Sequence, residues 1–300
     1  MRVSTSTLYD QGVRSMLQQQ DGMFKLQQQL STGKRIMTPS DDPIGAARAH
    51  ELAQSISLNT QYADNRYRAA DSLQLVDSTL GSISNLIQSV RTMAVAAGNP
   101  TFSDSERQMM AIELRGHFDE LLGLANTKDE QGNYLFSGFQ GNIRPFEQTG
   151  GSVTYQGDQG QRLIQVSGSR QLPVSETGEA VFVQTGSGES LFDTLGNFIT
   201  TLEPNNTNLS DELSTAIGNL DFALDNVLSK RASTGSRLQE IDTLQQIGED
   251  TAIQYKQSLS RLQDLDFAQA ISDMIRQQAL LEAAQKTFTR VSDLSLFNMI

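Results

Sequence analysis

The chain has 300 residues and carries a formal net charge of −12, from 35 acidic and 23 basic side chains. It contains no cysteine, which excludes disulfides, thiolate metal sites and a cysteine nucleophile. Lysine and arginine form no dense patch, so neither nucleic acid nor an anionic membrane is an expected partner. No apolar stretch approaches the roughly 18 residues of a membrane-spanning helix. The first eight residues lack the apolar core of a secretory signal, which by itself favours a cytosolic protein.

The first 38 residues are polar with a sparse apolar pattern. Steps of three and four residues along this segment predict a helix with one narrow apolar face. A lone helix of this quality is marginal in water. The positions on this face, the N-terminal seam, are Tyr9, Val13, Met16, Gln20, Met23, Gln27 and Leu30.

A turn is predicted directly after this helix. Gly33 suits the left-handed conformation that ends helices. Pro39 and Pro43 flank an acidic segment in which Asp42 is placed to cap a following helix, with Pro43 at its first position. We therefore expect Gly33, Pro39, Asp42 and Pro43 to form a hinge between two helical segments.

Long helices are predicted on both sides of the middle of the chain. Residues 43–97 contain no proline after Pro43, and Gly98-Asn99-Pro100 ends the helical pattern. A capping box, Ser103 with Glu106, begins a second helix that ends near Asn126. The helical pattern returns at Leu209 and continues toward the C-terminus. These segments predict a long antiparallel helical bundle.

Between residues 131 and 201 the glycine content rises and the apolar period shortens to two. We expect strands at residues 133–136 and 180–183, and a hairpin of residues 152–155 with 162–166 around Gly157–Gly160. Strands would make up about half of this β-rich insert.

Residues 259–291 contain neither glycine nor proline, so one unbroken helix is predicted. Its apolar positions recur as a heptad pattern that requires a partner surface. The N-terminal helix is the obvious partner, and we expect the two chain ends to associate. The positions of this C-terminal seam are Phe267, Ala270, Met274, Gln277, Leu281, Ala284, Phe288 and Val291.

The predicted fold is mainly α with a β insert, an α+β arrangement in which both chain ends contribute to a long helical bundle. Three domains are expected. Residues 1–40 with 257–300 form a terminal coiled-coil module, residues 41–130 with 203–256 form the long-helix bundle, and residues 131–202 form the β-rich outer domain.

No group of residues predicts catalysis, a metal site or a cofactor. His50 and His117 lie in predicted helices without a matching ligand. Asp264 and Asp266 lack the further oxygens and the glycine of a calcium loop, so they are expected to cap a helix or face solvent. Gly186 and Gly188 lack the third glycine of a dinucleotide-binding loop.

Two segments resemble the signatures of bacterial flagellins. Residues 30–36, Leu-Ser-Thr-Gly-Lys-Arg-Ile, followed by residues 39–47, Pro-Ser-Asp-Asp-Pro-Ile-Gly-Ala-Ala, are similar to the amino-terminal signature. Residues 260–270, with Gln278 and Leu281 after them, are similar to the carboxy-terminal signature. Residues 1–5, 132–138 and 294–298 are similar to the hook-associated branch of the family rather than to filament subunits.

The resemblance implies a structural protein, not an enzyme, at the junction between the flagellar hook and filament. Its ends would fold on assembly, with the terminal module lining the central channel and the insert outermost. The implied partners are hook-associated protein 1, flagellin, copies of itself in a ring and an export chaperone. The implied location is the extracellular flagellum, reached through the type III export apparatus without a cleaved signal peptide.

Two other hypotheses remain open from the sequence. A filament-forming flagellin with a short insert would share most of these features. A soluble coiled-coil signalling or effector protein would need ends that pair stably in the monomer and would not polymerise.

Overall fold

The structure is a computed structural model that describes residues 5–204, 206 and 208–297. It comprises two compact units, Met1–Leu58 with Asp250–Ile300 (unit 1) and Asn59–Glu249 (unit 2). The predicted fold class, mainly α with a small β region, is confirmed. None of the described helices is long and apolar enough to cross a membrane. The α-helices are α1 Thr5–Thr32, α2 Pro43–Ala97, α3 Asp104–Ala125, α4 Leu191–Thr201, α5 Leu209–Gln263 and α6 Phe267–Phe297.

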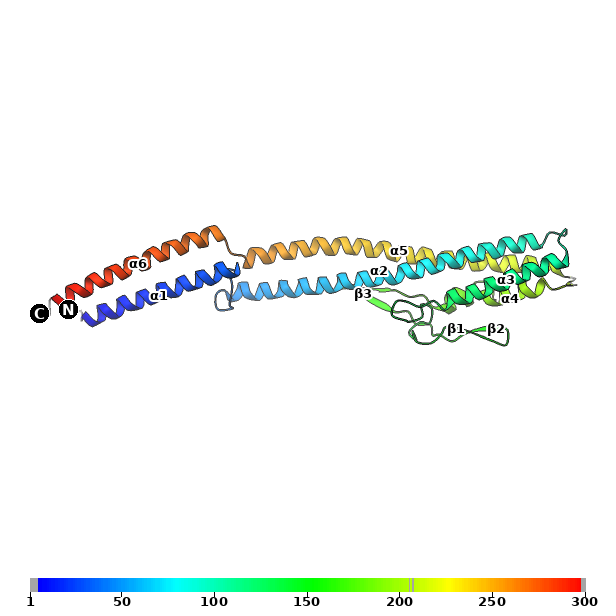
Figure 1. Cartoon of the computed structure of the whole chain (residues 1–300), viewed down its shortest axis with the longest axis horizontal. Helices are drawn as coiled ribbons and strands as arrows, with labels where there is room; N and C mark the ends of the chain where they lie inside the picture. Colours follow the sequence, from blue (N-terminus) through cyan, green and yellow to red (C-terminus); the bar gives the residue numbers. More distant parts are fainter. Residues whose placement is uncertain (1–4, 205, 207, 298–300) are drawn as a thin grey trace. The chain divides into compact units, whose positions relative to one another are not determined.

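Unit 1 pairs the two chain ends, with α1 and α6 side by side (Figure 1). The N-terminal part of α2 and the C-terminal part of α5 complete it. Gly33 follows α1 with φ +68°, a conformation that costs glycine little. Asp42 Oδ1 accepts a 2.9 Å hydrogen bond from the amide of Gly45, so Asp42 caps α2 with Pro43 as its first residue.

The prediction of one unbroken helix over residues 259–291 is wrong. The helix stops at Gln263, and α6 begins at Phe267. Asp266 Oδ1 accepts hydrogen bonds from the amides of Ala268 and Gln269, at 3.0 and 3.1 Å. This side chain satisfies the free N–H groups of a new helix, which makes an interruption possible without glycine or proline.

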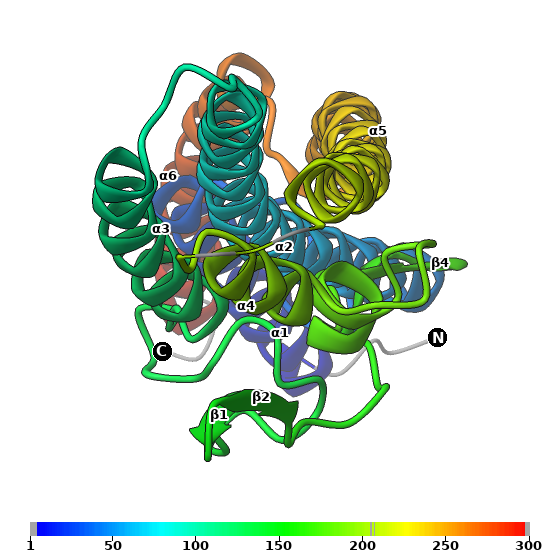
Figure 2. The same ribbon diagram turned by 90° about the vertical axis from the view of Figure 1, so that its right-hand side faces the viewer.

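Unit 2 is built on the C-terminal part of α2. Its core-facing side chains from Leu73 to Ala97 are almost fully buried. The predicted capping box begins α3, with the Ser103 side chain accepting from Glu106 N and the Glu106 carboxylate accepting from Ser103 N. In the end-on view of Figure 2, α4 lies beside α3, and it also packs on β2 (Ser152–Tyr155) and on a π-helical turn, η1 (Glu179–Val183).

The hairpin predicted between residues 152–155 and 162–166 is wrong. Instead, β1 (Phe146–Thr149) pairs with β2, and β3 (Leu163–Ser167) pairs with β4 (Arg170–Pro173), both antiparallel. Two residues join each pair, which favours tight hairpins. Gly150 and Gly151 have φ values of +63° and +97°, and this glycine pair is the turn signal that the prediction missed.

Two other predicted strands are absent from the described insert. Residues 133–136 contain only an isolated bridge, from Tyr134 to Lys128, and residues 180–183 lie in η1. Both segments supply buried aromatic rings, and those of Phe136 and Phe182 meet edge-on at 5.3 Å. A short buried apolar run fits a strand or a helical turn equally well. With strands of only four or five residues, the described insert contains much less strand than the predicted half.

Helix α4 was not predicted. Its N-cap is Ser190, whose side chain accepts a 3.0 Å hydrogen bond from the amide of Asp193. Leu195 and Phe198 of this helix are fully buried in the core of unit 2. The helix has only 11 residues, and its helical pattern of apolar residues was not recognised because the surrounding segment is rich in glycine.

The buried guanidinium of Arg66 joins the β3–β4 hairpin to the long helices of unit 2. Arg66 is 3% exposed. Its Nε donates to Gln245 Oε1 of α5 at 2.8 Å, and its Nη1 donates to the carbonyl of Val166 in β3 at 2.9 Å. Burial lowers the pKa of this guanidinium. The Arg66 side chain therefore connects three elements, α2, α5 and β3.

Replacing Arg66 with alanine is expected to lower the free energy of unfolding by about 2–4 kcal/mol, because it leaves buried acceptors unpaired and creates a cavity. Urea unfolding followed by circular dichroism measures the change. Arg68→Ala is the matched control, since Arg68 is exposed on the same helix. Equal stability of the two variants would contradict the role given to Arg66.

Candidate functional site: the terminal helix pair and its linkers

The C-terminal seam of α6 faces α1. Ala270 is 3% exposed. Phe267, at the start of the helix, remains 51% exposed. The side chain of Val291 lies outside the described residues. The remaining positions of the predicted seam are half-buried, namely Met274, Gln277, Leu281, Ala284 and Phe288.

The N-terminal seam lies on α1 with a partly different set of residues. Val13, Met16, Met23 and Leu30 are half-buried as the spacing suggests, whereas Tyr9, Gln20 and Gln27 are exposed. Gln19 and Leu26 are half-buried in place of the two glutamines. A step of three or of four residues from Met23 reaches Leu26 or Gln27, and both positions lie on the same helical face. Leu26 is the more hydrophobic of the two, so the sequence did contain a signal that favours Leu26 as the seam residue.

Close contacts fix the antiparallel register of the pair. The rings of Tyr9 and Phe288 have centroids 4.8 Å apart. A Cβ placed on Gly12 would lie 3.0 Å from the Phe288 ring, and one on Gly22 would lie 2.8 Å from Gln277 Nε2. Small residues on α1 thus allow longer side chains of α6 to approach its backbone.

The seam also buries polar atoms that lack partners. Within the described chain, Gln19 Oε1 and Gln277 Oε1 are buried and accept no hydrogen bond. Each unpaired buried acceptor costs about 1–3 kcal/mol. The interface between α1 and α6 is therefore both narrow and partly polar, and it holds the two helices weakly.

The two linkers between the helices pair with each other. Lys34 and Asp264 form an isolated antiparallel bridge. The amide of Arg35 donates to the carbonyl of Gln263 at 2.6 Å, and the amide of Leu265 donates to the carbonyl of Gly33 at 2.9 Å. Arg35 Nη2 adds a 2.9 Å hydrogen bond to the carbonyl of Leu262. We call this arrangement the linker clasp.

Asp41 ties the first linker to α1. Lys25 Nζ lies 2.6 Å from Asp41 Oδ1. Oδ2 accepts hydrogen bonds from the amides of Met37 and Thr38, at 3.2 and 3.0 Å. The Lys25 ammonium, followed by these backbone donors, holds the pKa of Asp41 well below its usual range. The ionised carboxylate is thus part of the linker fold.

The predicted hinge residues lie around this arrangement. Gly33 ends α1, the exposed Pro39 lies in the first linker, and Asp42 with Pro43 begins α2. The structure gives one arrangement of these residues, so their action as a hinge stays a prediction.

Comparison with known proteins identifies the family. Residues 3–141 match the bacterial flagellin N-terminal helical region. The whole chain is 36% identical to flagellar hook-associated protein 3 of Salmonella typhimurium, covering 99% of that protein. It is 35% identical to the Escherichia coli protein of the same name, with equal coverage. The chain belongs to the flagellin family, in its hook-associated protein 3 branch.

Solved structures show the same fold. The chain matches flagellar hook-associated protein 3 of Legionella pneumophila with a TM-score of 0.66 and 20% identity, over 71% of this chain and 98% of that one. It matches the flagellar junction protein FlgL of the same organism with a TM-score of 0.63 and 19% identity, over 72% and 99%. A flagellin of Listeria innocua is 27% identical over 95% of this chain and 93% of its own length. The hook-associated assignment is therefore supported over the filament-forming alternative.

Replacing Gln277 with leucine is expected to stabilise the α1–α6 pair of this flagellin-family chain by about 1 kcal/mol, because it removes the unpaired buried oxygen of the Gln277 amide. Hydrogen exchange of the α1 and α6 amides measures the change, and exchange should slow about fivefold. Gln278→Leu, at an exposed neighbouring position, is the control. Exchange in Gln277→Leu as fast as in Gln278→Leu would show that the amide carries no such penalty.

Replacing Asp41 with asparagine is expected to destabilise the chain at neutral pH but to have less effect in acid. Because the folded-state pKa of Asp41 is lowered, its contribution is complete above the unfolded value of about 3.9 and is lost as pH falls below that value. Urea unfolding at neutral pH and at pH values below about 3.9 measures the difference in the free energy of unfolding between Asp41→Asn and the parent chain. Asp21→Asn, on an exposed part of α1, is the control. A difference independent of pH would contradict the assignment.

Proposed function

We propose that this chain is a structural protein of the bacterial flagellum that joins the hook to the filament. Its full-length similarity to hook-associated protein 3 supports this role, as does the fold it shares with a flagellar junction protein. The observation that carries the mechanism is the weakly packed pair of chain ends. The proposed role requires binding surfaces and no catalytic step.

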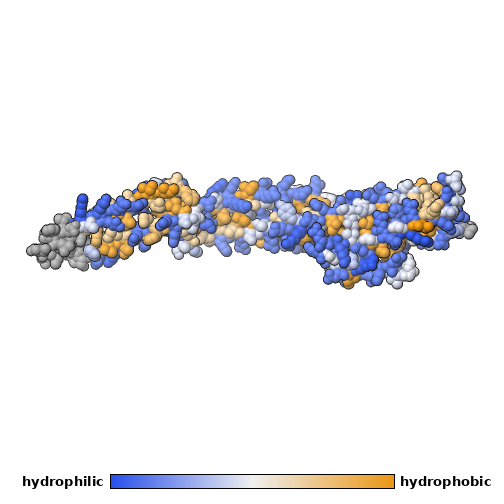
Figure 3. Space-filling model, in the orientation of Figure 1, coloured by the Kyte–Doolittle hydropathy of each residue, from blue (hydrophilic) through white to orange (hydrophobic). Residues whose placement is uncertain are grey.

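Folding of the chain ends is coupled to assembly in this proposal. The α1–α6 pair exposes large apolar side chains besides its seam, and apolar surface lies over both helices in Figure 3. Burial of such surface contributes about 25 cal/mol per Å², whereas ordering each residue costs about 1–2 kcal/mol. Neighbouring subunits would supply the missing burial. The exposed residues outside the seam are Leu17, Phe24, Ile271, Ile275 and Leu280.

The partners follow from the family and the proposed position. Hook-associated protein 1 would lie below this chain, flagellin above it, and further copies beside it in a ring. An export chaperone would cover the C-terminal seam before assembly. Membership of the family places the chain in the flagellum, and we propose extracellular delivery through the type III export apparatus without a cleaved signal peptide.

The three predicted domains correspond to three proposed positions in the assembly. Residues 1–40 with 257–300 would form the inner, channel-lining module, residues 41–130 with 203–256 the surrounding bundle, and residues 131–202 the outer domain. Unit 1 includes parts of α2 and α5 beyond the proposed inner module. This inner module would therefore be anchored on helices that continue into the bundle.

Replacing Leu281 or Phe288 with aspartate is expected to block incorporation into flagella while leaving unit 2 folded, because a charge would enter the α6 seam. Flagella from cells producing only the variant would lack filaments, and filament subunits would be lost to the medium. Protease resistance of unit 2 checks its folding. Gln285→Asp, on the exposed face of α6, is the control. Normal incorporation of Leu281→Asp and Phe288→Asp would contradict the proposal.

A second assay, with purified protein, distinguishes a junction protein from a filament subunit. Purified chain added to hooks that carry hook-associated protein 1 should bind as a short, limited layer that flagellin then extends. Long filaments formed by this chain alone, seen by electron microscopy, would identify a flagellin instead.

A further inference from the structure

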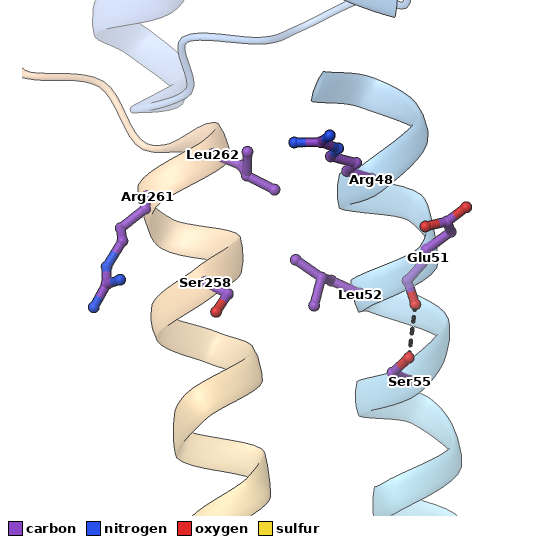
Figure 4. A pocket seen from close by; sticks show the side chains of 7 residues that line it. All are labelled: Arg48, Glu51, Leu52, Ser55, Ser258, Arg261 and Leu262. Atoms are coloured by element: carbon purple, nitrogen blue, oxygen red, sulfur yellow. Dashed lines mark hydrogen bonds between the residues drawn. The ribbon is translucent and has the colours of Figure 1, made fainter. Parts of the chain in front are cut away.

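A groove of about 570 Å³ lies in unit 1, between the start of α2 and the end of α5 (Figure 4). Leu52 and Leu262 face each other across it, and the hydroxyl of Ser258 lies on the α5 side. Arg48 reaches into the gap from α2, while the side chain of Arg261, on α5, is directed away from the gap. The groove therefore combines a small apolar floor with one guanidinium group, that of Arg48.

Neither guanidinium has a partner in the described part of the chain. Arg48 and Arg261 are exposed and take part in none of its ion pairs or side-chain hydrogen bonds. Glu51, the acidic residue of the groove, points away from the gap in Figure 4. The unpaired Arg48 guanidinium beside apolar floor residues favours a ligand that carries a carboxylate on an apolar face.

Apolar surface continues along α2 beyond the groove. Ile44, one turn before Arg48, is 69% exposed. A single small anion would not cover this residue. The length of this surface therefore fits a helix lying across the groove better than it fits a free ion.

The outer face of α1 has the complementary pattern. Leu17, Asp21 and Phe24 follow one another at spacings of four and three residues and so share one helical face. Leu17 is 54% exposed and Phe24 56% exposed. Asp10 lies on the same face, and neither it nor Asp21 has an ion-pair partner in the described chain. Arg14 is the one base on this face, which leaves it acidic.

The two surfaces do not meet within one chain. The opposite face of α1 packs on α6, and Lys25 with the linker clasp holds α1 in place. Leu17 and Phe24 remain exposed in that arrangement. Contact between the α1 face and the groove therefore requires two molecules.

We propose that the groove receives the outer face of α1 from a second copy of this chain. Asp21 pairs with Arg48, and Leu17 and Phe24 cover the leucine floor. Different surfaces meet in this contact, so it is heterologous and propagates from copy to copy until a ring closes. The inference rests on the proposed function and specifies how neighbouring copies in the ring recognise each other.

Cysteine crosslinking in flagella tests this contact, because the chain has no cysteine of its own. Cells co-produce two variants, Gln28→Cys on the outer face of α1 and Ser258→Cys in the groove. Purified flagella are treated with a short bis-maleimide. The expected result is a covalent dimer that forms only when both variants are present. Ser15→Cys with Ser258→Cys is the control, since Ser15 is exposed on α1 away from this face.

Charge exchange makes the test specific. In the same crosslinking background, Asp21→Arg should lower the dimer yield about tenfold, and adding Arg48→Asp should restore it. Asp64→Arg, at an exposed position of unit 2, should have no effect. A dimer yield no higher than that of the Ser15 control, in flagella that contain the chain, would overturn this contact but leave the junction role intact. Absence of the parent chain from flagella would overturn both.

Discussion

The narrow seam between α1 and α6 is the constraint on which the proposed mechanism depends. Its apolar positions are only half-buried, and it encloses the unpaired carbonyls of Gln19 and Gln277. A wider, fully apolar interface would make the pair stable alone. The seam instead holds the two ends in register while leaving most of their apolar surface available. Weak pairing in the free chain and strong pairing in an assembly then follow from the same residues.

The linkers make the two ends depend on each other. The clasp joins Gly33 and Arg35 of one linker to Gln263 and Leu265 of the other through backbone hydrogen bonds. Backbone pairing of this kind needs both linkers in place, so disorder in one end removes partners from the other. The ionised Asp41, bonded to Lys25 and to its own turn, extends the arrangement into α1. Ordering of α1 and α6 is thus a joint event.

The helices and the α6 seam were predictable because their apolar residues keep a helical period over many turns. The break at Asp264–Asp266 was missed although a helix cap was one of the two roles expected for this pair, because a side chain rather than glycine or proline starts the new helix there. In the insert, residues 180–183 form a π-helical turn because the ring of Phe182 packs among other aromatic rings of the core. Tertiary packing determined the conformation of that segment, so the local sequence pattern could not predict it. The linker clasp and the Arg48 groove join residues more than 200 positions apart, which spacing alone does not reveal.

The contrast between the two units explains how one chain combines a stable part with an adaptable part. Unit 2 is closed by fully buried aromatic and aliphatic side chains and by buried charged groups with partners, such as Glu176, whose Oε1 lies 2.8 Å from Arg237 Nη1. Such a core is close-packed within one chain. Unit 1 has half-buried seams, exposed apolar faces and guanidinium groups without partners. Burial is therefore left unfinished where other subunits are proposed to bind, and in this proposal subunit contact completes the fold of unit 1.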